Sequence, residues 1–346
     1  MNLNRHTFTQ ESRLARWFGE STLDVLKETS RQLLVPTPIM FTPDGDAIYA
    51  VQGHFLGAMR GGAFVSLADL RQAGAMGASV TGQRHSIDKV GTTRVADFCN
   101  SVWRAGNMPP AAAAAAALAA GTHNNNTTSG AIPIRAAAGG QKLHFIGSEF
   151  QSSASEQSLL LYDRLWNGLI ALSSLAVQTC TLTGYPNSTG RYSAAPGEST
   201  GNFAFVANEA GATLSAVAHT WSMIYTDDAG NAAQAAAALA GISGAITNRI
   251  DHAGFAIPLL VGDYGVADIE SIQCSVNTVA AGAPTIVLAH PIAILPCGLP
   301  QQYIDGVNAA FNLCEVKDNA ALAFIELMAG ATASQRTAGL VTIVEG

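Results

Sequence analysis

Charged residues are scarce in this chain. Asp, Glu, Lys and Arg make up 12% of its 346 residues, which is about half their share in an ordinary soluble protein. Residues 1–108 hold 11 basic and 9 acidic side chains, whereas residues 109–346 hold 7 basic and 16 acidic ones. A soluble monomer normally keeps a charged surface, so we expect this chain to hide much of its surface against other subunits.

Clusters of basic residues and long apolar runs are also lacking. The formal net charge is −7 and Lys and Arg are scattered, which argues against nucleic acid as a partner because phosphate binding needs grouped cations. No apolar run reaches the roughly 18 residues of a membrane span. The first residues contain no apolar signal-peptide core. We therefore expect no membrane partner and assembly in a cytoplasm.

Recognisable chemical motifs are missing as well. The five cysteines are widely spaced, without a zinc-ligand pattern, and we expect buried free thiols. The phosphate-loop, dinucleotide, metalloprotease and nucleophile-elbow motifs do not occur. The sequence thus predicts no catalytic, cofactor-binding or metal-ligating residue, no cofactor and no enzymatic activity.

A few polar residues are candidates for functional sites. We interpret His219 as a core or interface histidine with one hydrogen bond, and residues 241–244 as a turn. The neighbours His85 and Asp88, and Asp251 and His252, could each form a local pair, although sequence neighbours often occur by chance. The acidic pair at residues 227–228 is expected to form a hydrogen-bonded turn, with a bound cation as the alternative.

The front of the chain has mixed secondary-structure signals. Apolar spacing predicts helix over residues 9–34 and a short helix over 66–73. Short apolar runs on either side of the Pro-Asp-Gly-Asp sequence at 43–46 predict a hairpin. Residues 83–89 are polar and are expected to form a surface loop. We assign residues 1–108 to a smaller α+β region.

Residues 109–130 form the clearest compositional boundary. Two prolines precede an alanine run, and Gly121 is followed by an Asn/Thr/Ser-rich tail. An isolated alanine helix of this length is marginal in water, so a linker is at least as plausible an interpretation as a helix.

From residue 131 onward the pattern favours β-structure. Alternation is clearest over residues 214–226, where Trp221, Met223 and Tyr225 fall on one side; Phe203, Phe205 and Ala207 also share a strand face. Many short strands with regular turns predict a mainly β protein, with an antiparallel β-sandwich or jelly-roll-like oligomerisation domain at residues 131–346. The other expected strands cover residues 142–146, 158–165, 175–182, 256–261, 269–275, 285–295, 311–316, 322–328 and 340–344.

Several stretches resemble structural proteins of tailed-bacteriophage particles. They include LLVPTPIMFTPDGD at residues 33–46, GGAFVSLADLRQAGAMG at 61–77, HSIDKVGTTR at 85–94, LHFIGSEFQ…LLLYDRLW at 143–166, YTDDAGN at 225–231, VGDYGVADIESIQCS at 261–275 and VLAHPIAILPC at 287–297. The resemblance lies in these short local sequences rather than in a diagnostic motif. It covers most of the chain.

The resemblance implies a virion component present in many copies. It points to a head decoration (cement) protein with a β-sandwich fold, which forms a homotrimer, binds the phage major capsid protein and carries no catalytic residues. Typical small cement proteins are shorter than this chain, so the resemblance implies that the extra region at residues 1–108 contacts the capsid or a neighbouring subunit. The alternatives are the major capsid protein itself, a tail or neck protein, and a glycan hydrolase on the particle surface. A shell protein of the common type would show a long charged helix and an extended loop. The only long helix that we expect, at residues 9–34, lies at the N-terminus.

Overall fold

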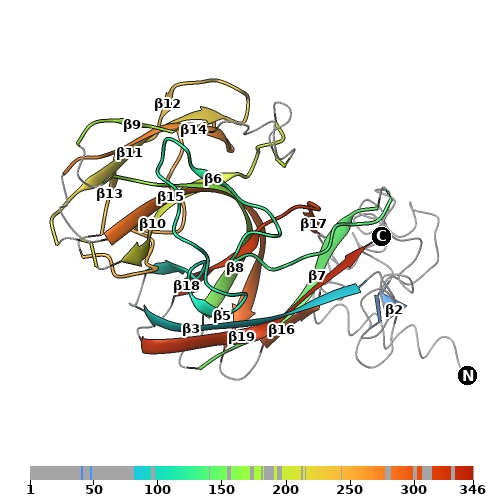
Figure 1. Cartoon of the computed structure of the whole chain (residues 1–346). Coiled ribbons are helices and arrows are strands. Elements are labelled where there is room, and N and C mark those ends of the chain that lie inside the picture. Colours follow the sequence, from blue (N-terminus) through green and yellow to red (C-terminus); the bar gives the residue numbers. More distant parts are fainter. Residues whose placement is uncertain are drawn as a thin grey trace, which may run out of the picture.

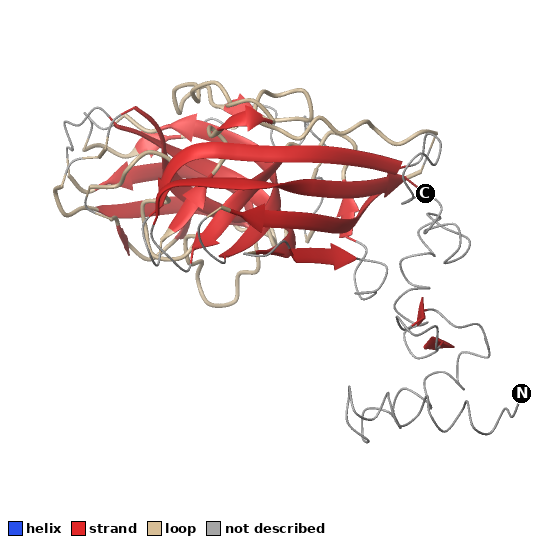
Figure 2. Ribbon diagram, turned by 90° about the horizontal axis from the view of Figure 1, so that it is seen from below, coloured by secondary structure: helices blue, strands red, loops and turns tan. Residues whose placement is uncertain are grey.

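The described part of the chain consists of strands and loops (Figure 2). The computed structural model describes residues 40–41, 47–48, 82–94, 98–139, 141–153, 157–171, 175–180, 182, 191–192, 197–211, 213–214, 216–242, 244–276, 282–298, 302–305, 314–328 and 332–345. No helix occurs within these ranges. The prediction of a mainly β protein is therefore confirmed, while the helices expected at 9–34 and 66–73 lie outside the described residues.

A short hairpin is the first described element. β1 (Met40–Phe41) pairs antiparallel with β2 (Ala47–Ile48). The turn sequence at residues 43–46 separates the two strands, so the hairpin expected there is confirmed.

The central sheet is six-stranded within the described residues, and all its pairings are antiparallel. Its order is β10-β15-β8-β18-β4, and β6 also pairs with β8 (Figure 1). The strands are β4 (Cys99–Ser101), β6 (Thr122–His123), β8 (Gln157–Leu169), β10 (Phe203–Gly211), β15 (Gly282–Cys297) and β18 (Leu322–Met328).

Two further antiparallel sheets pack against the central one. In the second sheet the order is β16-β7-β19-β3-β5, with β17 beside β7; its strands are β3 (Gly82–Arg94), β5 (Gly106–Met108), β7 (Leu143–Ser152), β16 (Gln302–Asp305), β17 (Cys314–Val316) and β19 (Thr332–Glu345). In the third sheet the order is β12-β11-β14-β9, with β13 beside β11; its strands are β9 (Gln178–Thr179), β11 (Thr220–Asp227), β12 (Gln234–Ala235), β13 (Leu239–Ala240) and β14 (Val266–Cys274).

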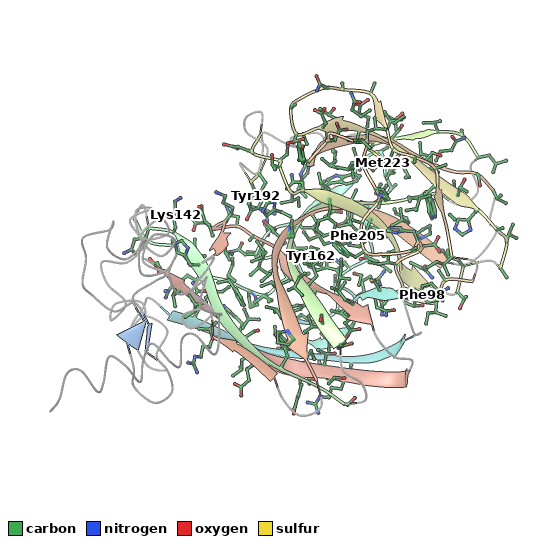
Figure 3. All side chains as sticks on the ribbon, turned by 180° about the vertical axis from the view of Figure 1, so that it is seen from behind. Phe98, Lys142, Tyr162, Tyr192, Phe205 and Met223 are labelled. Atoms are coloured by element: carbon green, nitrogen blue, oxygen red, sulfur yellow. The ribbon has the colours of Figure 1, made fainter. Side chains whose placement is uncertain are left out.

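Three apolar clusters form the core, and two of them join an outer sheet to the central one. One contains Trp221 and Met223 of the third sheet with Trp166 of the central sheet, and another joins the second sheet to the central one. The third cluster lies on the opposite side of β10 and includes Tyr162 and Phe205, which are deep inside the body (Figure 3). Because successive strand residues face opposite sides, one strand can supply two cores.

The side-chain alternation predicted for two strands is confirmed. Phe203, Phe205 and Ala207 enter one cluster, while the intervening residues 204 and 206 enter another. Burial alternates along β11 as well, although that strand begins at Thr220 rather than at 214. The expected strand at 175–182 shrinks to β9, and residues 256–261 form a loop rather than a strand.

The prediction of a surface loop at residues 83–89 is wrong. These residues belong to β3, which pairs along its length with β19 (Figure 1). Polar residues dominate the stretch, but Gln83, Ile87 and Lys89 are buried. The Lys89 ammonium donates hydrogen bonds to the carbonyl oxygens of Ala105 (3.2 Å) and Pro109 (2.7 Å). These two acceptors satisfy the charged group inside the protein, where the sequence predicts a solvent-exposed lysine.

The boundaries expected at residues 108 and 130 do not separate packed units in the described part of the chain. β3 and β4 come from the front region, yet they pair with β19 and β18 near the C-terminal end. The 109–130 segment is neither a helix nor a free linker. It lies along the central sheet as loop, with a turn at residues 118–120 and the short strand β6, and Ala112 and Leu118 are buried in the apolar clusters.

Candidate functional site

A pair of oppositely charged residues is buried on one face of β8. Arg164 donates two hydrogen bonds to Glu209, Nη1 to Oε1 at 2.7 Å and Nη2 to Oε2 at 2.6 Å. The Arg164 guanidinium also lies 4.8 Å from the ring centre of Trp103, and Ser101 donates to Glu209 at 2.9 Å. Burial by itself lowers the pKa of Arg164, but the neighbouring Glu209 carboxylate and Tyr162 hydroxyl together offset burial, and the net effect is a raised pKa.

A second buried pair involves the preceding residue of the same strand. Adjacent strand residues point to opposite faces, so Asp163 meets a different cation, Arg191. The Arg191 guanidinium donates to Asp163 at 2.8 Å and 3.1 Å. Asp163 also accepts the backbone N–H of Ala321 at 2.8 Å. Neighbouring charges on β8 are thus each neutralised inside the protein.

Burial of charge extends well beyond these four residues. Of the 23 charged residues in 109–346, at least nine have buried side chains, and these are Asp163, Arg164, Arg191, Glu209, Asp227, Arg249, Asp251, Glu326 and Glu345. The outer surface of this region is therefore even poorer in charge than its composition indicates.

His219 is held by two acceptors rather than by one. Its Nε2 lies 2.6 Å from Asp251 Oδ2, and its Nδ1 lies 3.0 Å from the carbonyl oxygen of Val217. A carboxylate and a carbonyl can only accept, so this geometry suits an imidazolium with a proton on each ring nitrogen. The hydrogen bond to Asp251 raises the pKa of His219. Asp251 also accepts Trp221 Nε1 at 2.9 Å. With both nitrogens committed and the ring buried, His219 is a structural clamp.

The two local histidine pairs that the sequence allows do not form. Asp88 instead accepts hydrogen bonds from Arg336 and Asn107, and burial lowers the pKa of His85. Asp251 engages His219, whereas His252 Nε2 lies 3.3 Å from the backbone nitrogen of Val206. Among the side chains that the structure describes, no group of three or more His, Cys, Asp or Glu could hold a metal ion.

The acidic turn behaves as expected from the sequence. Asp227 accepts from the backbone and side-chain nitrogens of Asn231 at 2.7 Å and 2.8 Å. Asp228 accepts from Thr200 and from the backbone of Tyr264. Hydrogen bonds within and around the turn therefore account for both carboxylates.

Gly241, the first residue of the stretch that is expected to form a turn, lies beside the histidine clamp. Gly241 donates its backbone N–H to the carbonyl of His219 at 2.9 Å, and an added Cβ would overlap the imidazole ring. The cysteines Cys180, Cys274 and Cys297 are buried free thiols, and Cys99 is half-buried. In the described ranges, no helix is long and apolar enough to cross a membrane.

An apolar hollow of about 630 Å³ opens at one end of the central sheet. It forms at the end of β10 that begins with Phe203. Phe203 pairs with Ala289, and β15 runs on beyond this pair to Cys297 without a β10 partner. Here β15 bulges, with Ile292 as the extra residue opposite β8. The lining comes from residues 201–203, 255–257, 259–260, 263–264 and 291–294 together with Leu160.

Large apolar side chains are exposed around this hollow. Leu260 is 40% exposed, Ile294 59% and Tyr264 73%, and Val261 of the same loop is fully exposed. Asp263 is the one formally charged residue among the described residues that line the hollow. This combination of exposed apolar groups around a concave surface is typical of a protein–protein contact site.

The loop that carries three of these side chains is firmly anchored. The Tyr225 hydroxyl donates to Asp263 Oδ2 at 2.5 Å and accepts the backbone N–H of Leu260 at 2.9 Å. Burial, reinforced by Asp263, raises the pKa of Tyr225 to about 12. Gly262 has a φ of +105°, which few other residues adopt, and it lets the loop reverse at its tip.

Sequence reasoning missed both the buried ion pairs and the hollow. The charge of residues 163 and 164 was visible, but their partners lie 28 and 45 positions away, and neither spacing has a periodic signal. The run Phe255 to Tyr264 is rich in apolar residues and was interpreted partly as a strand. A proline at 258 and a glycine at 262 were the signals that could have indicated a loop with exposed apolar residues.

Comparisons with known proteins identify no family for the chain. No protein-family model matches it, and no curated protein matches it. One solved structure, that of infectious bursal disease virus Gt strain, matches with 11% sequence identity over 77% of this chain and 81% of that chain. Its TM-score is 0.16, too low to carry any argument about fold or function.

Proposed function

We propose that this chain is a non-enzymatic structural protein of a tailed-phage particle, namely a capsid decoration protein that forms a trimer and stabilises the head shell. The burial of at least nine of the 23 charged residues in 109–346 carries the proposal. A solvent-facing surface that is left so poor in charge favours permanent contact with other protein surfaces.

The buried ion pairs fit a rigid building block. Replacing such pairs by apolar side chains is often neutral or stabilising, but removal of one partner is costly. Pairs such as Arg164–Glu209 therefore fix one arrangement of the strands more than they add to stability. A lattice component needs one fixed shape, since every copy must present the same surfaces.

The head location rests on the sequence resemblance and is tested by copy number. Quantitative mass spectrometry of purified particles should find the chain in numbers comparable to the shell subunit. The purified protein should also rebind heads from which it has been stripped. A handful of copies per particle would contradict the head location and favour the neck or tail. Self-assembly of the purified chain into closed shells would favour the major capsid protein.

A further inference from the structure

The apolar hollow and its anchored loop form a continuous surface with an unusual exposure of large side chains. Eight large hydrophobic residues of the described part are 40% exposed or more, and four of them, Leu260, Val261, Tyr264 and Ile294, belong to this surface. We call these four side chains, together with the hollow, the apolar face. Exposed apolar groups are ordinary when scattered, but a group of this kind around a hollow marks a contact site.

The edge strand at the apolar face is unsuited to pairing with another strand. Past Ala289, β15 has no β10 partner, and this part contains Pro291 and Pro296. Proline has no N–H to donate and is typical of edges that resist strand addition. A partner is therefore expected to pack side chains against the face rather than to extend the sheet.

Charge favours a second copy of this chain as the occupant. The chain has a net charge of −7, so two copies repel each other unless they meet where charge is sparse. The lining of the hollow contains no Lys, Arg or Glu, and the Oδ2 of its one carboxylate, Asp263, accepts the hydroxyl of Tyr225. Nothing in this lining is suited to attract a nucleic acid or a strongly charged protein.

The loop is also prepared for binding. Tyr225 holds residues 260 and 263, and the carbonyl of Tyr264 accepts the backbone N–H of Gly201 at 2.8 Å. A pre-ordered loop loses little conformational freedom when a partner arrives, so more of the gain from apolar burial remains as affinity. The projecting side chains lie next to a hollow of about 630 Å³, which supplies both a knob and a hole to a neighbouring copy.

We infer that the apolar face is the contact through which copies of this chain associate. The inference rests on the proposed self-association and deepens it by naming the surface. A standard interface covers about 800 Å² per partner. The four side chains would therefore form the centre of such an interface, and neighbouring residues would form its rim. Central apolar and aromatic residues of this kind commonly dominate binding.

The test compares two exposed apolar positions that differ in location. Ile294 is 59% exposed at the hollow, and Val177, beside β9 and outside the lining of the hollow, is 57% exposed. Ile294→Asp and Val177→Asp therefore add the same charge at nearly equal exposure. Tyr264→Asp is a second variant in the face. Size-exclusion chromatography with light scattering over a concentration series gives the dissociation constant of each full-length protein, and circular dichroism confirms its folding.

We expect the wild type and Val177→Asp to assemble equally well. Ile294→Asp and Tyr264→Asp should each weaken association by at least about 30-fold, the effect of losing a central interface residue. Association of both face variants with wild-type affinity would overturn this inference and leave the proposed function standing. Equal weakening by Val177→Asp would also overturn it, because charge alone would then explain the effect. A monomeric wild type would overturn the proposed function itself.

Discussion

At the scale of single residues, the position of the charges matters more than their number. The sequence indicates few charges after residue 108, and that observation led to an expectation of buried surface. It could not indicate that Asp163 and Arg164 point to opposite faces of β8 and meet Arg191 and Glu209. Such partners are brought together by sheet pairing, which leaves no local pattern in the sequence.

Removing one member of a buried pair should be costly. Arg164→Met leaves the Glu209 carboxylate buried without its guanidinium, and we expect a loss of about 3–5 kcal/mol in the free energy of unfolding. Urea denaturation measures the loss. Arg336→Ala serves as the control, because Arg336 is 60% exposed in its pair with Asp88, and an exposed pair contributes less than about 1 kcal/mol. Equal losses in the two variants would contradict the assignment.

The His219 clamp predicts a specific dependence of stability on pH. Its pKa in the folded protein lies above the ordinary value of 6.5, so the folded state binds the proton more tightly than the unfolded state. The stabilisation is therefore complete below pH 6.5 and is lost as the pH rises through the folded pKa. The free energy of unfolding of His219→Asn, measured by urea denaturation at several pH values, should lack this pH-dependent stabilisation. A difference between wild type and variant that stays constant from pH 6 to pH 9 would refute the charged clamp.

At the scale of elements, the sequence predicted strands best where alternation was regular. The expected ranges overlap four observed strands, β11, β14, β15 and β18. In these segments apolar residues either alternate with polar ones or form a continuous run. β3 was missed because its inward residues include Gln83 and Lys89, whose polar ends are satisfied by backbone groups of other segments. Packing of this kind overrides a polarity pattern.

The buried Lys89 predicts a rise in stability at high pH. Burial lowers its pKa from 10.5 to about 8 in the folded protein. Between these two values the unfolded chain binds more protons, so the free energy of unfolding rises with pH across that window. The variant Lys89→Met should reduce this slope in urea denaturation at pH 8, 9 and 10. Parallel slopes for wild type and variant would contradict the lowering of the Lys89 pKa by burial.

The order of the 260–263 loop should depend on the hydroxyl group of Tyr225. Tyr225→Phe removes the acceptor for the Leu260 N–H and the donor to Asp263, while the buried ring remains. A lost hydrogen bond contributes on the order of 1 kcal/mol, so the Leu260 amide should exchange its hydrogen several-fold faster. Amides in β8 should keep their wild-type exchange rates and serve as the internal control. Unchanged exchange at Leu260 would show that Tyr225 does not anchor the loop.

At the scale of the whole molecule, scarcity of charge and burial of charge point in the same direction. Composition alone supported self-association but gave no location, because it does not show which side chains stay outside. The structure places large apolar side chains around a hollow at the end of β15. The division expected at residue 108 rests on local composition in the same way. Strands from both regions share sheets, and pairing between distant segments is not visible in local composition.

Sedimentation velocity of the purified full-length chain tests the central claim of self-association most directly. The account predicts one discrete species at three times the mass of the chain at micromolar concentration. It also predicts that added salt leaves this species intact or strengthens it, because salt screens the repulsion between acidic copies without weakening apolar contact. A single species at the mass of one chain over the whole concentration range would contradict the account.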